Sequence, residues 1–269
     1  MSTVISSRTN PRVKQLAALQ QRKYREAHGL FWAEGCTLAA AALASAWRVE
    51  EIAVAEPAAE PVEDVVRQAA ARQVPVTRYS AACFEKFSAL RHPEGIGALM
   101  RMPPLAPLPE AQAGTILVLW RLQDPGNAGT LIRTGVAFGC ATVVAVEPCV
   151  DLFHPQCVRA SAGALFHISV CRPAEAVCRA WLARHAAHVT LLAPDAPAAV
   201  QAVPPASARI VVLGSEPHGL PRDLPPGLRA AAIPMRTGIE SLNVTAAGAI
   251  ALYEWWGAPR HPAPSRKAP

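Results

Sequence analysis

The sequence lacks any run of about eighteen strongly apolar residues, so we expect no membrane-spanning helix. Its first residues contain no apolar segment of the kind found in secretory signals, which predicts a cytoplasmic protein. No C-x-x-C spacing occurs and the seven cysteines are scattered singly. We therefore expect neither a zinc site nor a disulfide framework, and no metal at all.

The sequence does contain a moderate excess of basic residues, with a formal net charge of +6. That total is compatible with a polyanionic partner but does not by itself indicate one. Within residues 8–25 no acidic side chain occurs. Such a cluster predicts either a surface that holds phosphates or simply a solvated helix face. Its members are Arg8, Arg12, Lys14, Arg22, Lys23 and Arg25.

The first hundred residues read as a small α/β unit. Asn10-Pro11 predicts a helix start, with a capping side chain followed by proline, and the helix is expected over residues 11–26. Further elements follow in alternation. We expect strands at 29–35, 49–54, 74–78 and 96–101, and helices at 37–45 and 61–72.

Residues 102–112 hold four prolines, which predicts a semi-rigid connector over 102–113. From residue 114 to 257, strongly apolar strands alternate with helices, and this pattern predicts a parallel sheet with helices on both faces. Strands are expected at 115–120, 141–146, 167–171, 188–193, 209–214 and 231–234, and helices at 129–138, 156–163, 174–185 and 241–256. The proline-rich, basic residues 258–269 are expected to be disordered.

Three loops that follow predicted strands carry unusual polar sequences, and ligands bind at such loops in parallel sheets. The first, QDPGNAGTLIRT, combines a predicted turn at residues 124–127 with a helix that carries Arg133. The second is GSEPHGLP, where Gly214 would let a ligand approach the backbone and Glu216 would face it. The third is IPMRTGIESLNV, in which Ser241 or Asn243 could also simply cap the last helix.

Taken together, the three loops closely resemble the signature motifs of the SpoU (TrmH-like) RNA ribose methyltransferases, members of the SPOUT superfamily. The family's D-P-x-N-x-G-x-x-x-R-T is met from Asp124 to Thr134, its G-x-E-x-x-G-[LI] from Gly214 to Leu220, and its I-P-M…S-L-N-V from Ile233 to Val244. The segment RASAGALF at 159–166 also resembles the family. Residues 1–101 are similar to the L30e-like, RNA-substrate-binding domain that often precedes this module.

The resemblance implies a trefoil-knotted SPOUT domain, a homodimer, and S-adenosylmethionine as the cofactor. Arg133 would contact the ribose 2′-oxygen or an adjacent phosphate, either as a base or by stabilising charge, while Asn127 and Glu216 orient it and Ser241 and Asn243 shape the pocket. Cofactor contacts are expected from backbone groups at Leu213, Gly214, Ile233 and Leu242, with Ala193 a further candidate. The basic cluster would bind RNA.

Two other functions compete with this interpretation. A dehydrogenase would need a G-x-G-x-x-G turn after the first strand of the sheet, and the turn here, DPGNAG, does not provide it. A non-catalytic RNA-binding or ribosome-assembly protein that keeps the fold stays open, although all the motif residues above are present. Ribosomal RNA is preferred over transfer RNA as the substrate, because the L30e-like domain commonly accompanies rRNA enzymes.

Overall fold

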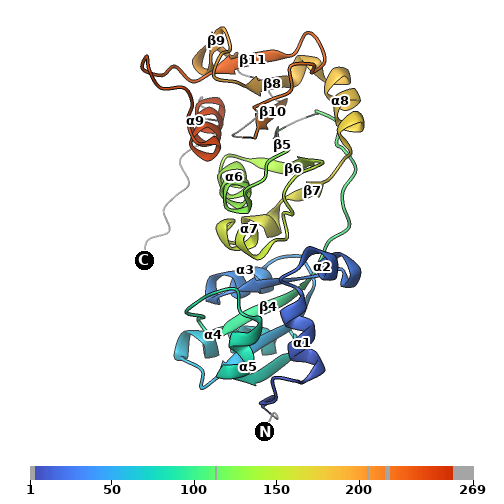
Figure 1. Ribbon diagram of the computed structural model, residues 1–269, viewed down its shortest axis with the longest axis vertical. Coiled ribbons are helices and arrows are strands. Elements are labelled where there is room, and N and C mark those ends of the chain that lie inside the picture. Colours follow the sequence, from blue (N-terminus) through green and yellow to red (C-terminus); the bar gives the residue numbers. More distant parts are fainter. Residues whose placement is uncertain (1–3, 113, 205, 207, 216–218, 257–269) are drawn as a thin grey trace. The chain divides into compact units, whose positions relative to one another are not determined.

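A computed structural model describes residues 4–256 except 113, 205, 207 and 216–218 (Figure 1). The chain forms two compact units. The first unit comprises Met1–Leu105, Asp124–Arg133 and Val150–His167, and the second comprises Ala106–Gln123, Thr134–Cys149 and Ile168–Pro269. The predicted tail at 258–269 lies outside the described residues.

The first unit contains a mixed four-stranded sheet in the order β1-β4-β2-β3. β4 is antiparallel to both β1 and β2, whereas β2 and β3 are parallel. The strands are β1 (Leu30–Glu34), β2 (Val49–Glu56), β3 (Val76–Ser80) and β4 (Ile96–Arg101). All four lie where the sequence predicted strands, within a few residues.

Helices cover both faces of this sheet (Figure 1). Those packed on Trp32 and Tyr79 are α1 (Pro11–Ala18) and α5 (Ala81–Phe87), and those on the other face are α3 (Cys36–Ala44) and α4 (Glu60–Ala71). The Asn10 side chain accepts a hydrogen bond from the backbone N–H of Arg12 at 2.8 Å, which confirms the predicted helix start. The single helix predicted over 11–26 is wrong: α1 ends at Ala18 and α2 (Arg22–His28) begins after a turn that follows the buried Leu19.

Two segments from later in the chain complete the first unit. α7 (Pro155–Ala160) packs on β1, and the rings of Phe153 and Phe166 contact those of Phe31 and Trp47, with centroids 5.1 to 6.4 Å apart. A 3-10 turn, η1 (Ala164–His167), follows α7. Aromatic side chains bury a large apolar area, so this cluster joins β1 firmly to the segment around α7.

The second unit contains a seven-stranded sheet in the order β7-β6-β5-β10-β8-β11-β9, in which every described pair is parallel. This confirms the predicted parallel sheet. Its strands are β5 (Gly114–Trp120), β6 (Cys140–Val146), β7 (Ser169–Cys171), β8 (Val189–Leu192), β9 (Ala198–Ala199), β10 (Ala208–Gly214) and β11 (Arg229–Ala232). All their carboxyl ends therefore meet at one edge.

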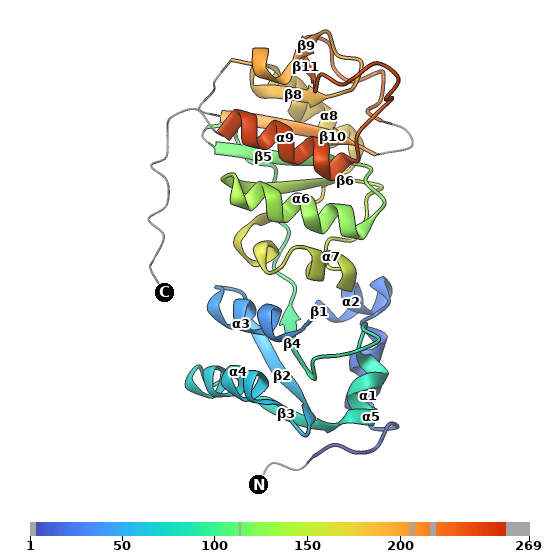
Figure 2. The same ribbon diagram turned by 90° about the vertical axis from the view of Figure 1, so that its left-hand side faces the viewer.

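Helices lie on both faces of the parallel sheet, as predicted. On one face α8 (Glu175–Arg184) packs through Trp181 against every second residue of β5 and β10, such as Val118 and Val212. On the other face α9 (Val244–Trp256) packs on β10 and β8, as Figure 2 shows. Also on this face, Gly135 near the end of α6 (Pro125–Ala137) packs on Leu117 of β5. Short 3-10 turns, η2 (Ala186–His188) and η3 (Val200–Ala202), lie between the later strands.

The proline-rich residues 102–112 form no helix or strand. From Ala106 onward they pack along the second unit: Ala106 N donates to Val170 O at 2.8 Å, and Trp181 Nε1 donates to Pro109 O at 2.8 Å. Leu108 and Ala111 pack against the same apolar core as Trp181. Because proline fixes φ, a segment of this kind loses little further freedom when it packs in this way.

Candidate functional site

A cavity of about 510 Å³ opens at the carboxyl edge of the parallel sheet. Its walls come from the segments that follow three neighbouring strands and from the start of α9, all within the second unit. The lining residues are Leu192, Ala193, Pro194 and Asp195 after β8; Leu213, Gly214, Ser215, Gly219, Leu220 and Arg222 after β10; Ile233 and Met235 after β11; and Ser241, Leu242, Val244 and Ala247 at α9.

The wall formed after β10 depends on two glycines. A Cβ on Gly214 would lie 2.4 Å from the carbonyl carbon of Gly219, so no other residue fits without moving backbone. Gly219 N donates to Ser215 O at 2.7 Å, and Gly219 has φ +60°, a conformation that side chains with a Cβ rarely adopt. Gly219 therefore lies against the end of β10 and forms part of one side of the cavity.

All five residues predicted to bind the cofactor line this single cavity. Leu213 and Gly214 end β10, Ile233 follows β11, and Ala193 follows β8. Leu242 lies before α9 and is accompanied by Ser241, which was predicted for the substrate side. Sequence reasoning did not name Asp195, although it follows a predicted strand and that rule could have found it. No sequence signal singled out Arg222.

The first polar loop is helical from Pro125 onward. The predicted turn at residues 124–127 is wrong, because α6 already begins at Pro125. The Asp124 carboxylate accepts a hydrogen bond from Asn127 N at 2.6 Å, and the Asp124 carbonyl accepts one from Ala128 N at 3.1 Å. Asp124 thus caps α6, and Pro125 takes the first helical position, where a missing N–H costs nothing.

Gly129 of the same motif is required by close packing between α6 and α7. A Cβ at Gly129 would lie 2.3 Å from Cys157 O and 2.7 Å from Ala160 Cβ. In the segment RASAGALF, Ser161 is buried and donates to Val158 O at 2.7 Å, and Gly163 has φ +88°. These motif residues therefore serve the local fold of the first unit.

The predicted catalytic residues fall in different places. Arg133 is exposed on α6, four residues after Gly129, and Asn127 is half-buried in the first turn of that helix. Asn243 is exposed, and its side-chain oxygen accepts a hydrogen bond from Thr245 N at 2.8 Å, so it caps α9. Glu216 lies outside the described residues.

The basic cluster divides into buried and exposed members. Arg25 has a side chain only 1% exposed; it donates to Asp151 Oδ2 through Nε at 3.0 Å and Nη2 at 2.6 Å, and to Leu19 O at 2.7 Å. Arg25 therefore offers no exposed nitrogen to a phosphate, which goes against its assignment to RNA. Arg12 donates to Glu51, and Arg22 pairs with Glu26. The exposed members are Arg8, Lys14 and Lys23.

Two further observations concern the described residues only. They contain no group of three or more His, Cys, Asp or Glu side chains placed to hold a metal ion. No helix among them is long and apolar enough to cross a membrane.

Comparisons with known proteins agree with the motifs. Residues 114–253 match the SpoU rRNA Methylase family, and residues 10–98 match the MRM3-like substrate binding domain. An uncharacterised tRNA/rRNA methyltransferase of Synechocystis is 32% identical over 93% of this chain and 92% of its own length. The 23S rRNA (guanosine(2553)-2′-O)-methyltransferase RlmP of Bacillus subtilis is 30% identical over 94% of this chain and 99% of its own.

Solved structures with the same fold cover nearly the whole chain. The S-adenosylmethionine-bound rRNA methyltransferase of Sinorhizobium meliloti aligns with a TM-score of 0.82 and 29% identity, over 94% of this chain and 97% of that one. An RNA 2′-O ribose methyltransferase aligns with a TM-score of 0.79 and 30% identity over the same shares. The chain therefore belongs to the SpoU rRNA methylase family and is an S-adenosylmethionine-dependent methyltransferase.

Proposed function

We propose that this protein transfers a methyl group from S-adenosylmethionine to a ribose 2′-hydroxyl of ribosomal RNA, with the cofactor held in the cavity at the ends of β8, β10 and β11. One observation carries this assignment. The five residues that the sequence analysis expects at the cofactor come from four separate segments, yet all line that cavity.

The residues present fit the cofactor. A cavity of about 510 Å³ is within the usual range of small-molecule sites, about 300–1,000 Å³. Leu213, Leu242 and Val244 supply apolar wall for a flat base. Asp195 and Arg222 are exposed at the cavity and carry opposite charges, which suits the ammonium and carboxylate of an amino-acid moiety.

When bound, the cofactor supplies a methyl group activated by its sulfonium. The chain itself must hold the ribose hydroxyl and stabilise the charge that develops as its proton leaves. Arg133 is assigned this role, because a guanidinium can donate several hydrogen bonds to a developing oxyanion and Arg133 is exposed on α6. Asn127 and Glu216 would orient Arg133, and Ser241 and Asn243 would shape the substrate side of the pocket.

Exposed cations of the first unit are assigned to the RNA backbone. Arg8, Lys14 and Lys23 offer charge at the surface of α1, α2 and the segment before them. Arg8 and Lys86 are joined by a hydrogen bond from Lys86 Nζ to Arg8 O at 3.0 Å, which brings a further cation beside the cluster. Phosphate contacts of this kind supply affinity without sequence specificity.

A homodimer through α9 is part of the proposal. Tyr253 and Ile250 lie on α9 with 62% and 40% of their surface exposed, and Phe138 stacks edge-on with Tyr253 at 5.8 Å between centroids. Such an apolar patch on a helix is suited to cover by a second copy. Because α9 also contributes Val244 and Ala247 to the cavity, a dimer through this helix would brace the cofactor site. A monomeric Tyr253→Glu variant beside a dimeric wild type in sedimentation would support this arrangement.

The remaining expectations stay part of the proposal. They are a substrate-binding domain over 1–101, a connector over 102–113, a catalytic domain over 114–257, a trefoil knot in the latter, and a cytoplasmic location. The alignment of residues 10–98 and 114–253 with two separate families supports the division between them.

The decisive experiment follows labelled methyl groups from S-adenosylmethionine into ribosomal RNA. We expect one ribose to be methylated, and a 2′-deoxy nucleotide at that position to abolish transfer. The position equivalent to the guanosine modified by the Bacillus subtilis relative is the first to examine. Arg133→Ala should lower the rate by about 10²–10³-fold, the cost of losing one charge-stabilising donor. Arg184→Ala, an exposed arginine on α8, is the matched control.

Tight RNA binding without transfer to any cellular RNA would instead favour the non-catalytic alternative. Methylation that survives the 2′-deoxy substitution would place the methyl group on the base and contradict the assignment to ribose.

A further inference from the structure

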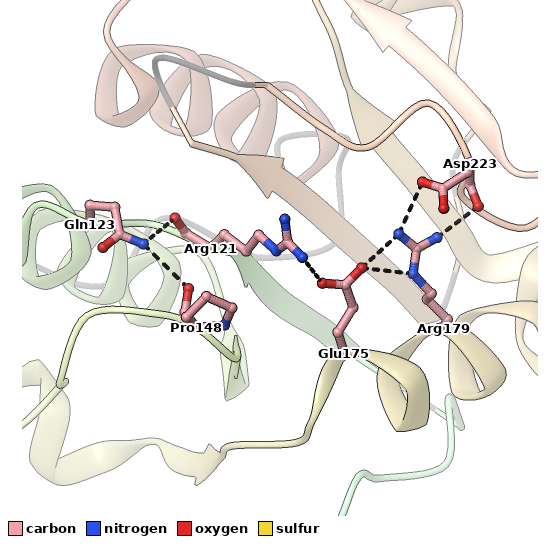
Figure 3. Close-up of polar contacts among 6 residues, drawn as sticks. All are labelled: Arg121, Gln123, Pro148, Glu175, Arg179 and Asp223. Carbon is pink, nitrogen blue, oxygen red and sulfur yellow. Dashed lines mark hydrogen bonds and ion pairs between the residues drawn. The ribbon is translucent and has the colours of Figure 1, made fainter.

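A network of four charged side chains lies at the carboxyl ends of two neighbouring strands (Figure 3). β5 and β10 pair in parallel, with Gly214 opposite Trp120. One loop leaves β5 at Arg121 and the other leaves β10 at Ser215. Glu175, the first residue of α8, forms ion pairs with two arginines. Arg121 belongs to the first loop, and Arg179 contacts the second.

The second loop is held through its backbone. Arg179 Nη1 donates to Asp223 O at 2.7 Å, and Nη2 donates to Asp223 Oδ1 at 3.1 Å. Asp223 directly follows Arg222, which lines the cavity. Residues 220–228 form no helix or strand, so the conformation of this wall depends on side-chain contacts. Leu220, Leu224 and Leu228 supply apolar contacts to the core beneath.

Arg179 is itself fixed in place by Glu175. Its Nε and Nη2 donate to Glu175 Oε1 at 2.9 and 2.7 Å, and the two residues lie one helical turn apart on α8. Its guanidinium also lies 5.4 Å from the ring centroid of the buried Trp120. A planar fork held from two sides has little freedom, so the two bonds that it makes to Asp223 are well directed.

The other oxygen of Glu175 accepts from Arg121 Nη2. Arg121 has φ +54°, an uncommon conformation for a residue with a side chain, and Gln123 Nε2 donates to its carbonyl at 2.9 Å and to Pro148 O at 3.3 Å. Gln123 precedes Asp124, which caps the helix that carries the motif residues Asn127 and Arg133. The network therefore holds the turn that leads into α6 as well as the loop after β10.

We propose that Glu175 is a positioning residue for the cofactor: through Arg179 and Asp223 it holds residues 219–228, which contribute a wall of the cavity. Nothing in the sequence motifs includes Glu175 or Arg179. The inference rests on the proposed function in one respect, because it takes the cavity to be the cofactor site.

The exposure of the network argues that its contribution is local. The side chains of Glu175 and Arg179 are each 21% exposed, that of Arg121 49% and that of Asp223 80%. Pairs as exposed as these add little to overall stability. Their loss should therefore loosen the loop without unfolding the sheet beneath it, and the effect should appear in cofactor binding.

The test uses the full-length protein and Glu175→Gln, which keeps the shape and removes the charge. Calorimetric titration with S-adenosylmethionine and with its unreactive product S-adenosylhomocysteine gives the dissociation constants. We expect both to rise about fivefold, the loss of about 1 kcal/mol that a charged network can supply. The KM for the cofactor should rise in parallel, while kcat at saturating cofactor stays near that of the wild type.

Glu63→Gln is the matched control. The Glu63 carboxylate likewise accepts two hydrogen bonds from an arginine, Arg78, at 2.9 and 3.1 Å, and Glu63 lines no part of the cavity. Asp223→Asn provides a second variant at a residue too exposed to endanger folding. If both residues act through the loop, the dissociation constant of the double variant, Glu175→Gln with Asp223→Asn, should rise by less than the product of the two single-variant increases.

Unchanged dissociation constants in Glu175→Gln would overturn the positioning role. So would an equal rise of these constants in Glu63→Gln. A double variant whose dissociation constant rises by the full product of the two single-variant increases would overturn it as well. A lower kcat with an unchanged KM would also overturn it. These outcomes differ from failure of the proposed function, in which the wild type itself would bind neither ligand.

Discussion

The four-stranded and seven-stranded sheets use their charged side chains in different ways. In the first unit, Glu34 and Glu51 are 8% and 4% exposed, and each accepts hydrogen bonds from several groups. Glu34 accepts from Trp32 Nε1 and Ala89 N at 3.2 and 2.8 Å, and Glu51 accepts from Tyr79 Oη and Arg12 Nε at 2.8 and 2.9 Å. Burial, followed by the charge of Glu51, raises the pKa of Tyr79, which therefore keeps its proton and donates a hydrogen bond to Glu51 throughout the ordinary pH range.

In the second unit, the network around Glu175 remains partly in solvent at the open edge of the sheet. Burial alone would raise the pKa of Glu175, but the hydrogen bonds from Arg179 and Arg121 outweigh it and leave the pKa below its ordinary value. The comparison teaches that buried charges stabilise the interior of the first unit, whereas partly exposed charges hold the loops beside the cavity of the second unit. Four predictions test that difference, from the largest expected effect to the smallest.

Removing one partner of the buried pair in the first unit should cost most. Asp151→Ala leaves Arg25 without its carboxylate in a site where its side chain is 1% exposed. We expect the free energy of unfolding to fall by about 3–5 kcal/mol, because an uncompensated buried charge remains. Urea unfolding measures this. Asp64→Ala, whose exposed partner is Arg67, should change the same quantity by less than about 0.5 kcal/mol; equal losses in the two variants would remove the contrast.

Filling the space beside Gly214 should affect the cavity more than the fold. Gly214→Ala places a Cβ 2.4 Å from backbone of Gly219, so the loop must move. We expect a loss of about 1–3 kcal/mol in unfolding free energy and at least about tenfold weaker cofactor binding. Gly135→Ala, whose Cβ would meet only side-chain atoms, at 3.3 Å, serves as the control in calorimetry. Normal binding by Gly214→Ala would show that the loop does not form the cofactor wall.

The exposed cations should act on RNA affinity and its dependence on salt. Lys14→Ala and Lys23→Ala each remove one charge from the surface of the first unit. Each lost phosphate contact should lower the slope of log affinity against log salt by about 0.7–0.9. Filter binding at several salt concentrations measures the slope. Arg67→Ala, outside the cluster, should leave it unchanged, and identical slopes in all three variants would contradict the RNA assignment.

The smallest effect concerns His154. Its Nδ1 accepts from Gln156 N at 3.2 Å and so caps α7 in the neutral form. Burial lowers the pKa of His154 below its ordinary 6.5, and Arg25 lowers it further against the opposing charge of Asp151. Stability that depends on neutral His154 is therefore complete above pH 6.5 and declines as the pH falls from there toward the lowered pKa.

His154→Asn keeps a capping oxygen that does not titrate. Unfolding free energies measured between pH 7.5 and 5.5 should then vary less with pH than in the wild type. A steeper dependence in His154→Asn would contradict the capping role.

Local patterns predicted the strands well and the helix ends less well. Asn10-Pro11 was interpreted correctly as a helix start, yet Asp124-Pro125, with the same chemistry, was assigned to a turn. Gly126 and Asn127 are common turn residues and favoured the turn, whereas in the structure Asp124 caps a helix through Asn127 N and Ala128 N. α5 was missed, because seven residues are too few to display a helical period.

For the site, the predicted strand ends and the motifs named several residues around the cavity but not Asp195 or Arg222, since loops after parallel strands share one edge of the sheet. The sequence could not separate Arg25 from its exposed neighbours, because its burial depends on Asp151, 126 residues away. It offered both Ser241 and Asn243 as caps of the last helix, and only the observed start of α9 identifies Asn243 as the cap.

By itself, then, the sequence determined that an α/β unit precedes a parallel sheet, which loops carry the methyltransferase motifs, and to which family the chain belongs. These properties depend on neighbouring residues, whose apolar spacing and turn chemistry are local. Only the tertiary structure decided that β10 lies beside β5, that Gly214 must make room for Gly219, and that Glu175 holds the loops of both strands. The reason is that strand pairing brings together residues far apart in the chain, and their contacts arise only when the sheet has formed.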